Sequence, residues 1–245
     1  MTVDAGTGRP QRQSVREYVA ATLRAALIAG DLVPGRVYSA PTLASQLGVS
    51  ATPVREAMLD LVRDGMVDVA PNTGFRVTAV TAAELDHIAE IRLLLEVPIM
   101  GEIAAARSGE RDRQVEDLRP LVDSMIDAAE QQDLTKYLTT DTMFHTRFLA
   151  LHGNDVLVTT VQRLRDRSRL DGLKSVAQAG NLVESTREHY AMIDAALSHD
   201  RPAMERLMRE HLGHVRTDWA APSATTDSST QPTTIHEAAP KSGRV

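Results

Sequence analysis

Four side chains in the second half of the chain have the types and the spacing of metal ligands. Asp141 and His145 are four residues apart in a stretch of helical periodicity, so their side chains leave one helix face about one turn apart. His189 and His211 lie in two later helical stretches, at or beside apolar stripes that face a core. Imidazole and carboxylate bind divalent metals, but a single inward histidine is more often bonded to a carbonyl or a carboxylate. The residues alone leave both interpretations open.

Three arginines are candidates for binding an anion near these side chains. Arg92 lies in an otherwise apolar helical stretch, and a buried guanidinium must meet a negative group. That group is either Glu96, one turn further along the same helix, or the carboxylate of a bound small molecule, and the sequence favours neither. Arg165 and Arg169, four residues apart on a later helical stretch, are weaker candidates for the same role.

The composition limits both the chemistry and the class of protein. The chain has 245 residues, enough for two domains, and is 42% hydrophobic but only 3% aromatic, which is typical of helices packed on helices. It has no cysteine, so thiolate chemistry is excluded and a metal must be held by His, Asp or Glu. No apolar run approaches the roughly 20 residues of a membrane span, and the N-terminus does not resemble a signal peptide. We therefore expect a cytoplasmic protein without a membrane partner.

The first 80 residues have the pattern of a helix-turn-helix followed by a hairpin. Helices are predicted over 14–29, about 41–48 and 52–64, and short strands over 66–70 and 74–80. Ser50 is the expected N-cap of the third helix, and Pro53 is tolerated in its first turn because the N–H that proline lacks has no partner there. Two short helices joined by a tight turn are the helix-turn-helix arrangement, and the strands predict a hairpin wing beside it.

From Thr81 to about Trp219 the apolar residues recur with a helical period. The predicted helices are 81–108, 110–131, 133–152, 154–171, 174–199 and 200–219. Helices of this length favour an antiparallel bundle, in which side chains of facing helices build ligand sites. The predicted fold class is mainly α: an N-terminal winged helix-turn-helix of three helices and a small β-hairpin, then an all-α bundle of about six helices.

Several motifs in the N-terminal part carry a family resemblance. They are Gly30-Asp-Leu-Val-Pro-Gly35, Leu43-Ala-x-x-Leu-Gly-Val-Ser50, Thr52-Pro-Val-Arg-Glu-Ala57, Leu61-x-x-Asp-Gly65 and Pro71-x-x-Gly-Phe-Arg-Val77. Together they resemble the DNA-binding domain of the GntR family of bacterial transcription regulators. The resemblance implies that the start of the third helix faces operator DNA and that the wing reaches the DNA backbone or the minor groove. The residues implied are Ser50, Thr52 and Arg55 on the helix, and Asn72 and Gly74 in the wing.

The chemistry of these residues suits DNA, and the charge of the segment and one departure from the family pattern bear on how the chain binds it. A helix N-terminus attracts phosphate, hydroxyls donate to it, and an arginine can form two hydrogen bonds to guanine in the major groove. However, the segment 12–78 has a net charge of only +1, so tight binding is expected to need two copies on a two-fold operator. Ala51 also stands where many family members have arginine, so one expected DNA contact is missing.

The C-terminal part carries a second resemblance. The order of Asp141 and His145, then Glu188-His189, then His211-Leu212, resembles the FCD effector domain of the FadR subfamily of GntR regulators, as do Ile91-Arg-Leu-x-x-Glu96 and Ala104-Ala-Ala near its start. The resemblance implies that the aspartate and the three histidines hold a divalent metal, with zinc the first candidate and nickel or manganese the alternatives. Three neutral imidazoles and one carboxylate leave a divalent ion with a net positive charge. A small organic acid, held also by Arg92, Arg165 and Arg169, is therefore the expected effector.

These observations predict a sequence-specific transcription regulator, a repressor controlled by a small carboxylate, and not an enzyme. We expect a homodimer on a pseudo-palindromic operator. The expected domains are a disordered tail over 1–11, a DNA-binding domain over 12–80, a ligand-sensing and dimerisation domain over 81–220, and a second tail over 221–245.

Two alternatives stay open at this point. The first is a metal-dependent hydrolase in which Asp141, His145 and His189 hold zinc and activate water. It needs a general base that the motif does not supply, and it leaves the helix-turn-helix unexplained. The second keeps the regulator but makes the metal site purely structural, with no exchangeable effector.

Overall fold

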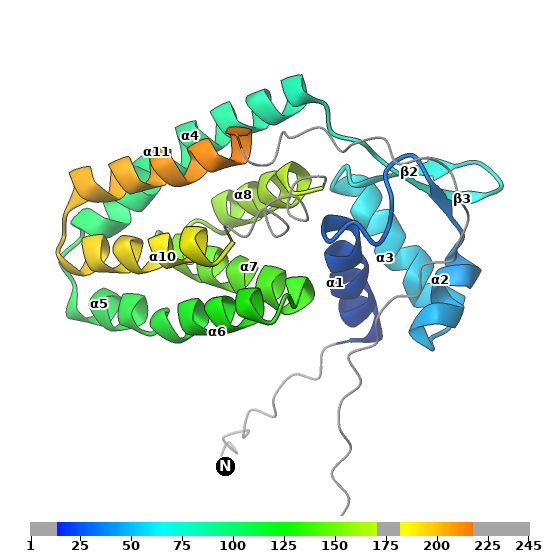
Figure 1. Cartoon of the computed structure of the whole chain (residues 1–245), viewed down its shortest axis with the longest axis horizontal. Coiled ribbons are helices and arrows are strands. Elements are labelled where there is room, and N and C mark those ends of the chain that lie inside the picture. Colours follow the sequence, from blue (N-terminus) through cyan, green and yellow to red (C-terminus); the bar gives the residue numbers. More distant parts are fainter. Residues whose placement is uncertain (1–13, 171–181, 218–245) are drawn as a thin grey trace, which may run out of the picture.

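In the computed structural model the chain forms a smaller N-terminal part of helices and strands and a larger, all-helical C-terminal part, which lie side by side (Figure 1). The structure describes residues 14–170 and 182–217, with side chains described as far as residue 213. The predicted tails, 1–11 and 221–245, lie outside the described residues, as does the beginning of the helix predicted over 174–199. The predicted fold class, mainly α with a winged helix-turn-helix, is confirmed.

The three helices of the N-terminal part are α1 (Val15–Ile28), α2 (Ala40–Leu47) and α3 (Ala51–Arg63). The first begins with a capping box, in which Ser14 and Glu17 each accept a hydrogen bond from the other's backbone N–H. Gly48 ends α2 with a φ of 65°, a left-handed conformation that glycine adopts without a Cβ clash. Ser50 is the N-cap of α3, as predicted, but its side chain makes no capping hydrogen bond. Its hydroxyl is therefore available to another partner.

The wing is an antiparallel sheet of β1 (Val37–Tyr38), β2 (Val67–Ala70) and β3 (Gly74–Val77), in the order β1-β3-β2. The two predicted strands pair as a hairpin, whereas the two-residue strand β1 was not predicted because it is too short for a hydrophobic alternation. Gly74 allows β1 to approach, since a Cβ built there would lie 2.3 Å from the Tyr38 carbonyl oxygen.

The C-terminal part consists of longer helices. In the described residues they are α4 (Ala82–Ala105), α5 (Gly109–Glu116), α6 (Arg119–Glu130), α7 (Leu134–Ala150), α8 (Asp155–Ser168), α10 (Leu182–Leu197) and α11 (Arg201–Thr217). The single helix predicted over 110–131 is wrong, because α5 ends at Glu116 and α6 begins at Arg119. Pro120 explains the break: it has no N–H to donate to the carbonyl of the preceding turn, and it is tolerated in the first turn of α6, where that N–H has no partner.

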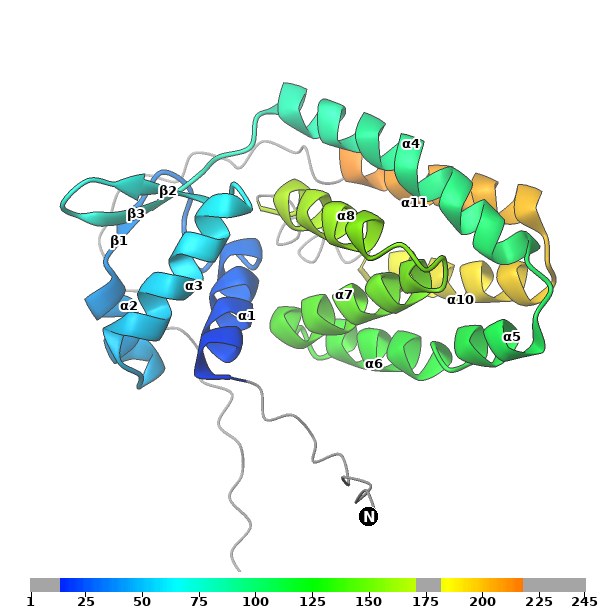
Figure 2. The same cartoon turned by 180° about the vertical axis from the view of Figure 1, so that it is seen from behind.

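The arrangement of these helices encloses the predicted ligands. Helices α4 and α11 lie side by side, and Gly101 on α4 leaves room for Glu205, which would come within 2.9 Å of an added Cβ (Figure 1). Helices α7 and α10 pack against α6, and α8 packs between α4 and α7 (Figure 2). No helix among the described residues is long and apolar enough to cross a membrane.

Candidate functional site

Three histidines meet inside the C-terminal part. His145 on α7, His189 on α10 and His211 on α11 form what we call the histidine cluster, with one ligand atom of each within 4.8 Å of the other two. The Nε2 atoms of His145 and His189 are 3.0 Å apart. Both of these side chains are buried, and that of His211 is 12% exposed. The helices therefore bring nitrogen donors from three separate segments to one point.

Asp141 lies beside this cluster and divides its two oxygens between different partners. Its Oδ1 is 3.7 Å from His145 Nε2 and 3.8 Å from His189 Nε2. Its Oδ2 accepts a hydrogen bond from Arg165 at 3.1 Å and a shorter one from Arg169. The structure thus brings together the aspartate and the three histidines named from the sequence, with Oδ1 facing the histidines and Oδ2 facing the arginines.

Hydrogen bonds at Nδ1 determine which ring nitrogen carries the proton in His189 and His211. His189 Nδ1 is 2.8 Å from the Thr186 carbonyl oxygen, and because a carbonyl only accepts, Nδ1 carries the proton. His211 Nδ1 lies 3.3 Å from Glu188 Oε2 and donates to it in the same way. The Nε2 lone pairs of both rings then point into the cluster. His145 Nε2 must donate across the 3.0 Å contact to His189, and a bound metal would displace that proton.

The ionisation states also match those of metal ligands. Burial lowers the pKa of His189 to about 4 and holds the pKa of His145 well below its usual value, so both rings are neutral near pH 7. Burial lowers the pKa of His211 as well. For Asp141, burial alone would raise the pKa, but the positive charges of Arg169 and Arg165 outweigh it and hold the pKa well below its usual range. The aspartate is therefore ionised.

A buried group of charges adjoins the histidine cluster, and we call it the arginine cluster: Arg92, Arg165 and Arg169 with the carboxylates of Glu96 and Asp141. Arg92 Nε donates to Glu96 Oε1 at 2.6 Å, so in this structure Arg92 is paired with Glu96, one of the two partners considered from the sequence. Arg165 bridges the carboxylates, at 3.4 Å from Glu96 Oε2 and 3.1 Å from Asp141 Oδ2.

The arginine cluster has one more positive charge than negative charges. Burial and the neighbouring Arg169 lower the pKa of Arg165 only to about 10, so this guanidinium stays protonated at neutral pH. Its Nε is buried and has no hydrogen-bond partner among the described residues. The unsatisfied donor favours an additional acceptor, such as an anion, at this position.

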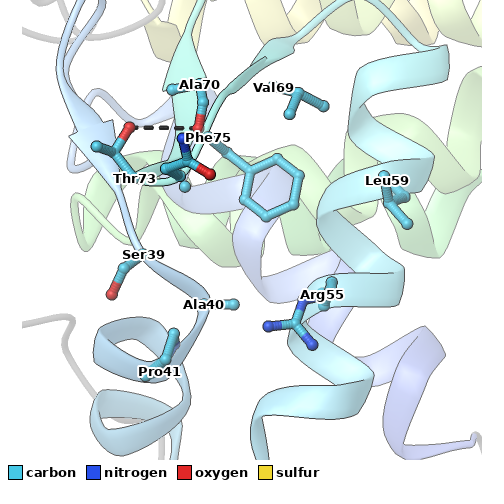
Figure 3. Close-up of a pocket in the computed structure, with 11 residues that line it drawn as sticks. Ser39, Ala40, Pro41, Arg55, Leu59, Val69, Ala70, Thr73 and Phe75 are labelled. Atoms are coloured by element: carbon cyan, nitrogen blue, oxygen red, sulfur yellow. Dashed lines mark hydrogen bonds between the residues drawn. The ribbon is translucent and has the colours of Figure 1, made fainter.

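The residues implied as DNA contacts lie on one side of the N-terminal part. Ser50, Thr52, Arg55 and Asn72 are exposed, and Gly74 is half-buried. A groove of about 520 Å³ runs between α3 and the wing, lined by Arg55, Asn72 and Gly74 together with apolar side chains including Leu59 and Phe75. Figure 3 shows the Arg55 guanidinium extending from α3 into this groove. The start of α3 and the tip of the wing therefore present polar groups to the same side of the molecule.

Two residues that orient the histidines were not identified from the sequence. Thr186 supplies the carbonyl for His189 from three residues earlier on α10, and this local spacing was a usable signal. Glu188 bonds to His211 on another helix, 23 residues later, and no sequence pattern indicates that contact.

Comparisons with known proteins agree with both halves of this description. Residues 15–77 match the model for bacterial regulatory proteins of the gntR family, and residues 87–214 match the FCD domain. The chain is 32% identical over 195 residues to the HTH-type transcriptional regulator McbR of Escherichia coli, covering 78% of this chain and 86% of that protein. It is 27% identical over 192 residues to the E. coli HTH-type transcriptional repressor GlaR, covering 76% of this chain and 87% of that protein.

Solved structures give the same result for the fold. The structure of E. coli McbR/YncC superposes with a TM-score of 0.70 at 26% identity, covering 82% of this chain and 94% of that chain. A GntR regulator from Rhodococcus sp. RHA1, at 21% identity, shares the fold with a TM-score of 0.63.

Proposed function

The chain belongs to the GntR family of bacterial transcription regulators and carries an FCD effector domain, and from this premise we propose how its DNA binding is controlled. It acts as a repressor whose affinity for operator DNA depends on a small organic acid bound beside a divalent metal. The observation that carries the proposal is the position of Asp141, with one oxygen toward the histidine cluster and the other held by the arginine cluster. In this proposal residues 12–80 bind DNA, and residues 81–220 sense the effector and dimerise.

The donor set fits a divalent transition metal. Asp141 Oδ1 and the Nε2 atoms of His145, His189 and His211 would hold it, and their hydrogen-bonded neighbours keep the rings in the ligand tautomer. Nitrogen and oxygen donors without thiolate suit zinc first, and nickel or manganese next. When bound, such an ion supplies positive charge and open coordination positions for a carboxylate.

Arg92, Arg165 and Arg169 supply the other side of the effector site. The buried Nε of Arg165, which has no hydrogen-bond partner among the described residues, supports binding of an anion at this position. A bound carboxylate can take hydrogen bonds that Arg165 now gives to Glu96 at 3.4 Å, since that contact is long for a charged pair. Binding of the effector therefore competes with the protein's own carboxylates for the same guanidinium groups.

On the DNA side, Ser50 and Thr52 would contact phosphate at the N-terminus of α3, and Arg55 a base edge in the major groove. Asn72 and Gly74 would bring the wing to the backbone or the minor groove. Because the segment 12–78 has a net charge of only +1, one copy alone holds DNA weakly, and a homodimer on a pseudo-palindromic operator doubles the contacts.

For the homodimer we propose the outer face of α4 as the contact between copies. Ile91 and Leu94, three residues apart on this helix, are 44% and 69% exposed, although both are large apolar side chains. A second copy is the occupant that fits, because the same apolar face on both subunits is self-complementary about a two-fold axis, and two-fold symmetry is what the operator requires.

The hydrolase alternative is not favoured by the site. A water-activating centre needs a general base that is free to accept a proton, and a carboxylate beside the metal is the candidate here. The two acids of the arginine cluster, Asp141 and Glu96, are each paired with arginine, and opposing charges hold the pKa of both below the usual value. Glu188 bonds to His211.

The proposal is tested in two measurements on the full chain. Elemental analysis should find about one metal ion per chain, and a His189→Ala, His211→Ala double variant should lose it. Fluorescence anisotropy with DNA from the chain's own upstream region should show Arg55→Ala weakening binding about tenfold or more. Arg147→Ala, an exposed arginine on α7, is the matched control and should bind like the wild type.

A thermal-shift screen of small organic acids, with and without chelator, then tests the effector. An acid that binds the native protein raises its melting temperature by mass action, and chelator should abolish the rise. Absence of stoichiometric metal, or metal retained in the double histidine variant, refutes the metal site. A ligand-induced rise in melting temperature that persists in the presence of chelator assigns the effector to a site that does not involve the metal.

A further inference from the structure

The last turn of α8 has two opposite faces with different partners. Arg165, Ser168 and Arg169 face the arginine cluster, and Ser168 Oγ lies 3.4 Å from Arg92 Nη1. Arg163, Asp166 and Arg167 face the N-terminal part. Each set follows the i, i+3, i+4 spacing of one helix face, and an offset of two residues, about 200°, puts the sets on opposite sides. One helix turn thus contacts both the candidate effector site and the DNA-binding part (Figure 2).

The contacts on the second face converge on the C-terminal end of the recognition helix α3. Arg167 donates to the carbonyl oxygen of Gly65, at 2.5 Å, and to the hydroxyl of Thr78. Gly65 follows Asp64, the C-cap of α3, and Thr78 follows the last residue of β3. Arg167 Nε also pairs with Glu84 in the first turn of α4, at 2.9 Å. A single guanidinium therefore joins α8 to the end of α3, the wing and the start of α4.

A second link runs through Arg24 on α1. Its Nε is 2.9 Å from Asp166 Oδ2, and its Nη2 donates to Asp64. The Asp166 side chain is 3% exposed, so this pair is screened little by solvent. Arg163 also reaches Asp64, at 3.1 Å, but its side chain is 57% exposed and we expect that pair to contribute little.

The interface around these ion pairs is incompletely packed. Two hollows of about 350 and 300 Å³ share Arg24, Gln162 and Asp166 in their walls. Close-packed side chains transmit strain directly, whereas open space leaves an element room to move. Between α1 and α8, a displacement is therefore carried by the directed ion pairs of Arg24 rather than by packed side chains.

We propose that the last turn of α8 couples the effector site to DNA binding, with Arg167 and the Arg24–Asp166 pair as the coupling contacts. This inference rests on the proposed function, and it names the route by which the state of Asp141 reaches the operator. A change in what Arg165 and Arg169 bind displaces the turn that carries them, and the opposite face then moves the C-terminal end of α3. Because α3 is about 20 Å long, a tilt of about 10° at that end moves its DNA-facing N-terminus by about 3 Å.

The test compares operator binding with and without metal, using zinc as the probe. Fluorescence anisotropy gives the operator Kd of chelator-treated and zinc-loaded full-length protein, and calorimetry gives the zinc Kd. In the wild type we expect zinc to change the operator Kd by about fivefold or more, within the usual range of allosteric coupling. In Arg167→Gln and, separately, Arg24→Gln, that change should fall below twofold while the zinc Kd stays within threefold of the wild-type value. The control Arg147→Gln should respond like the wild type.

Hydrogen exchange of residues 60–66 provides a readout that does not depend on DNA. Zinc should alter their exchange in the wild type and in Arg147→Gln, but not in Arg167→Gln. If Arg167→Gln and Arg24→Gln keep the full wild-type response, the coupling inference is overturned. It is also overturned if zinc binds the wild type but changes neither the operator Kd nor exchange at 60–66, and the proposed metal site then still stands. Failure of zinc to bind refutes the proposed metal site, and this inference with it.

Discussion

Replacing Asp141 by asparagine tests its role as the counter-charge of two buried arginines. Asparagine keeps the shape and one acceptor oxygen but removes the negative charge that faces Arg165 and Arg169. Breaking a buried ion pair by removing one partner costs about 3–5 kcal/mol, because the remaining charge stays buried. The retained acceptor places the expected loss at the lower end, about 3 kcal/mol. This loss does not depend on metal, because it comes from the arginine side of the residue.

The assay is urea unfolding of chelator-treated protein, followed by zinc calorimetry. We expect Asp141→Asn to lose both stability and most of its zinc affinity. His211→Ala should lose zinc affinity with a smaller loss of stability in the chelator-treated protein, because it lies outside the arginine cluster and its partner Glu188 is 31% exposed, so no buried charge loses its counter-charge. Asp127→Asn, an exposed aspartate on α6, is the matched control and should change neither. An Asp141→Asn protein within 1 kcal/mol of the wild type, against the roughly 3 kcal/mol expected, would refute the assignment of Asp141 as the counter-charge of two buried arginines.

Three further predictions follow from other parts of the structure. Burial lowers the pKa of His189 to about 4, below its unfolded value of about 6.5, so its contribution to stability is full above pH 6.5 and is lost as pH falls toward 4. The urea concentration at the unfolding midpoint of the chelator-treated protein should therefore be lower at pH 5 than at pH 7. This drop should be larger in the wild type than in a His189→Gln variant. Leu94→Glu places a charge on the exposed face of α4, so light scattering should find a monomer and the operator Kd should rise; a stable dimer would contradict the α4 interface. Gly74→Ala brings a Cβ within 2.3 Å of the Tyr38 carbonyl oxygen at a φ of 141°, so β1 should detach, with weaker operator binding and faster amide exchange at Tyr38; unchanged exchange would refute that close approach.

The features that the sequence predicted well are those with local signals. The winged helix-turn-helix depends on caps, turns and apolar spacing within short segments, such as Ser14 with Glu17 and the turn at Gly48. The spacing of Asp141 and His145 is likewise set within one helix, which is why their common face could be inferred. The break between α5 and α6 was missed although Pro120 marks it, because the apolar period continues across the break.

The features that could not be predicted depend on which segments approach each other. The sequence did not decide whether Arg92 pairs with Glu96 or with an effector. Only the packing of α8 against α4 shows that Glu96 accepts hydrogen bonds from both Arg92 and Arg165. No sequence pattern indicated the contacts of Arg167, because its partners Gly65 and Thr78 lie 102 and 89 residues earlier in the chain. Ion pairs between distant segments follow from the fold, and no period or motif in the sequence encodes them.

The position of Asp141 explains why metal, effector and DNA binding would act together in one chain. Its carboxylate is shared between the histidine cluster and two arginines of α8, so a change on one side alters the charge that the other side sees. A buried charge without a counter-charge is strongly destabilising. The protein can compensate such a charge either by binding an anion or by moving the arginines. Those arginines are on the same helix turn as Arg167, which is bonded to the end of α3. In the proposed mechanism, charge compensation at the site and the position of α3 are therefore coupled through one short segment of backbone.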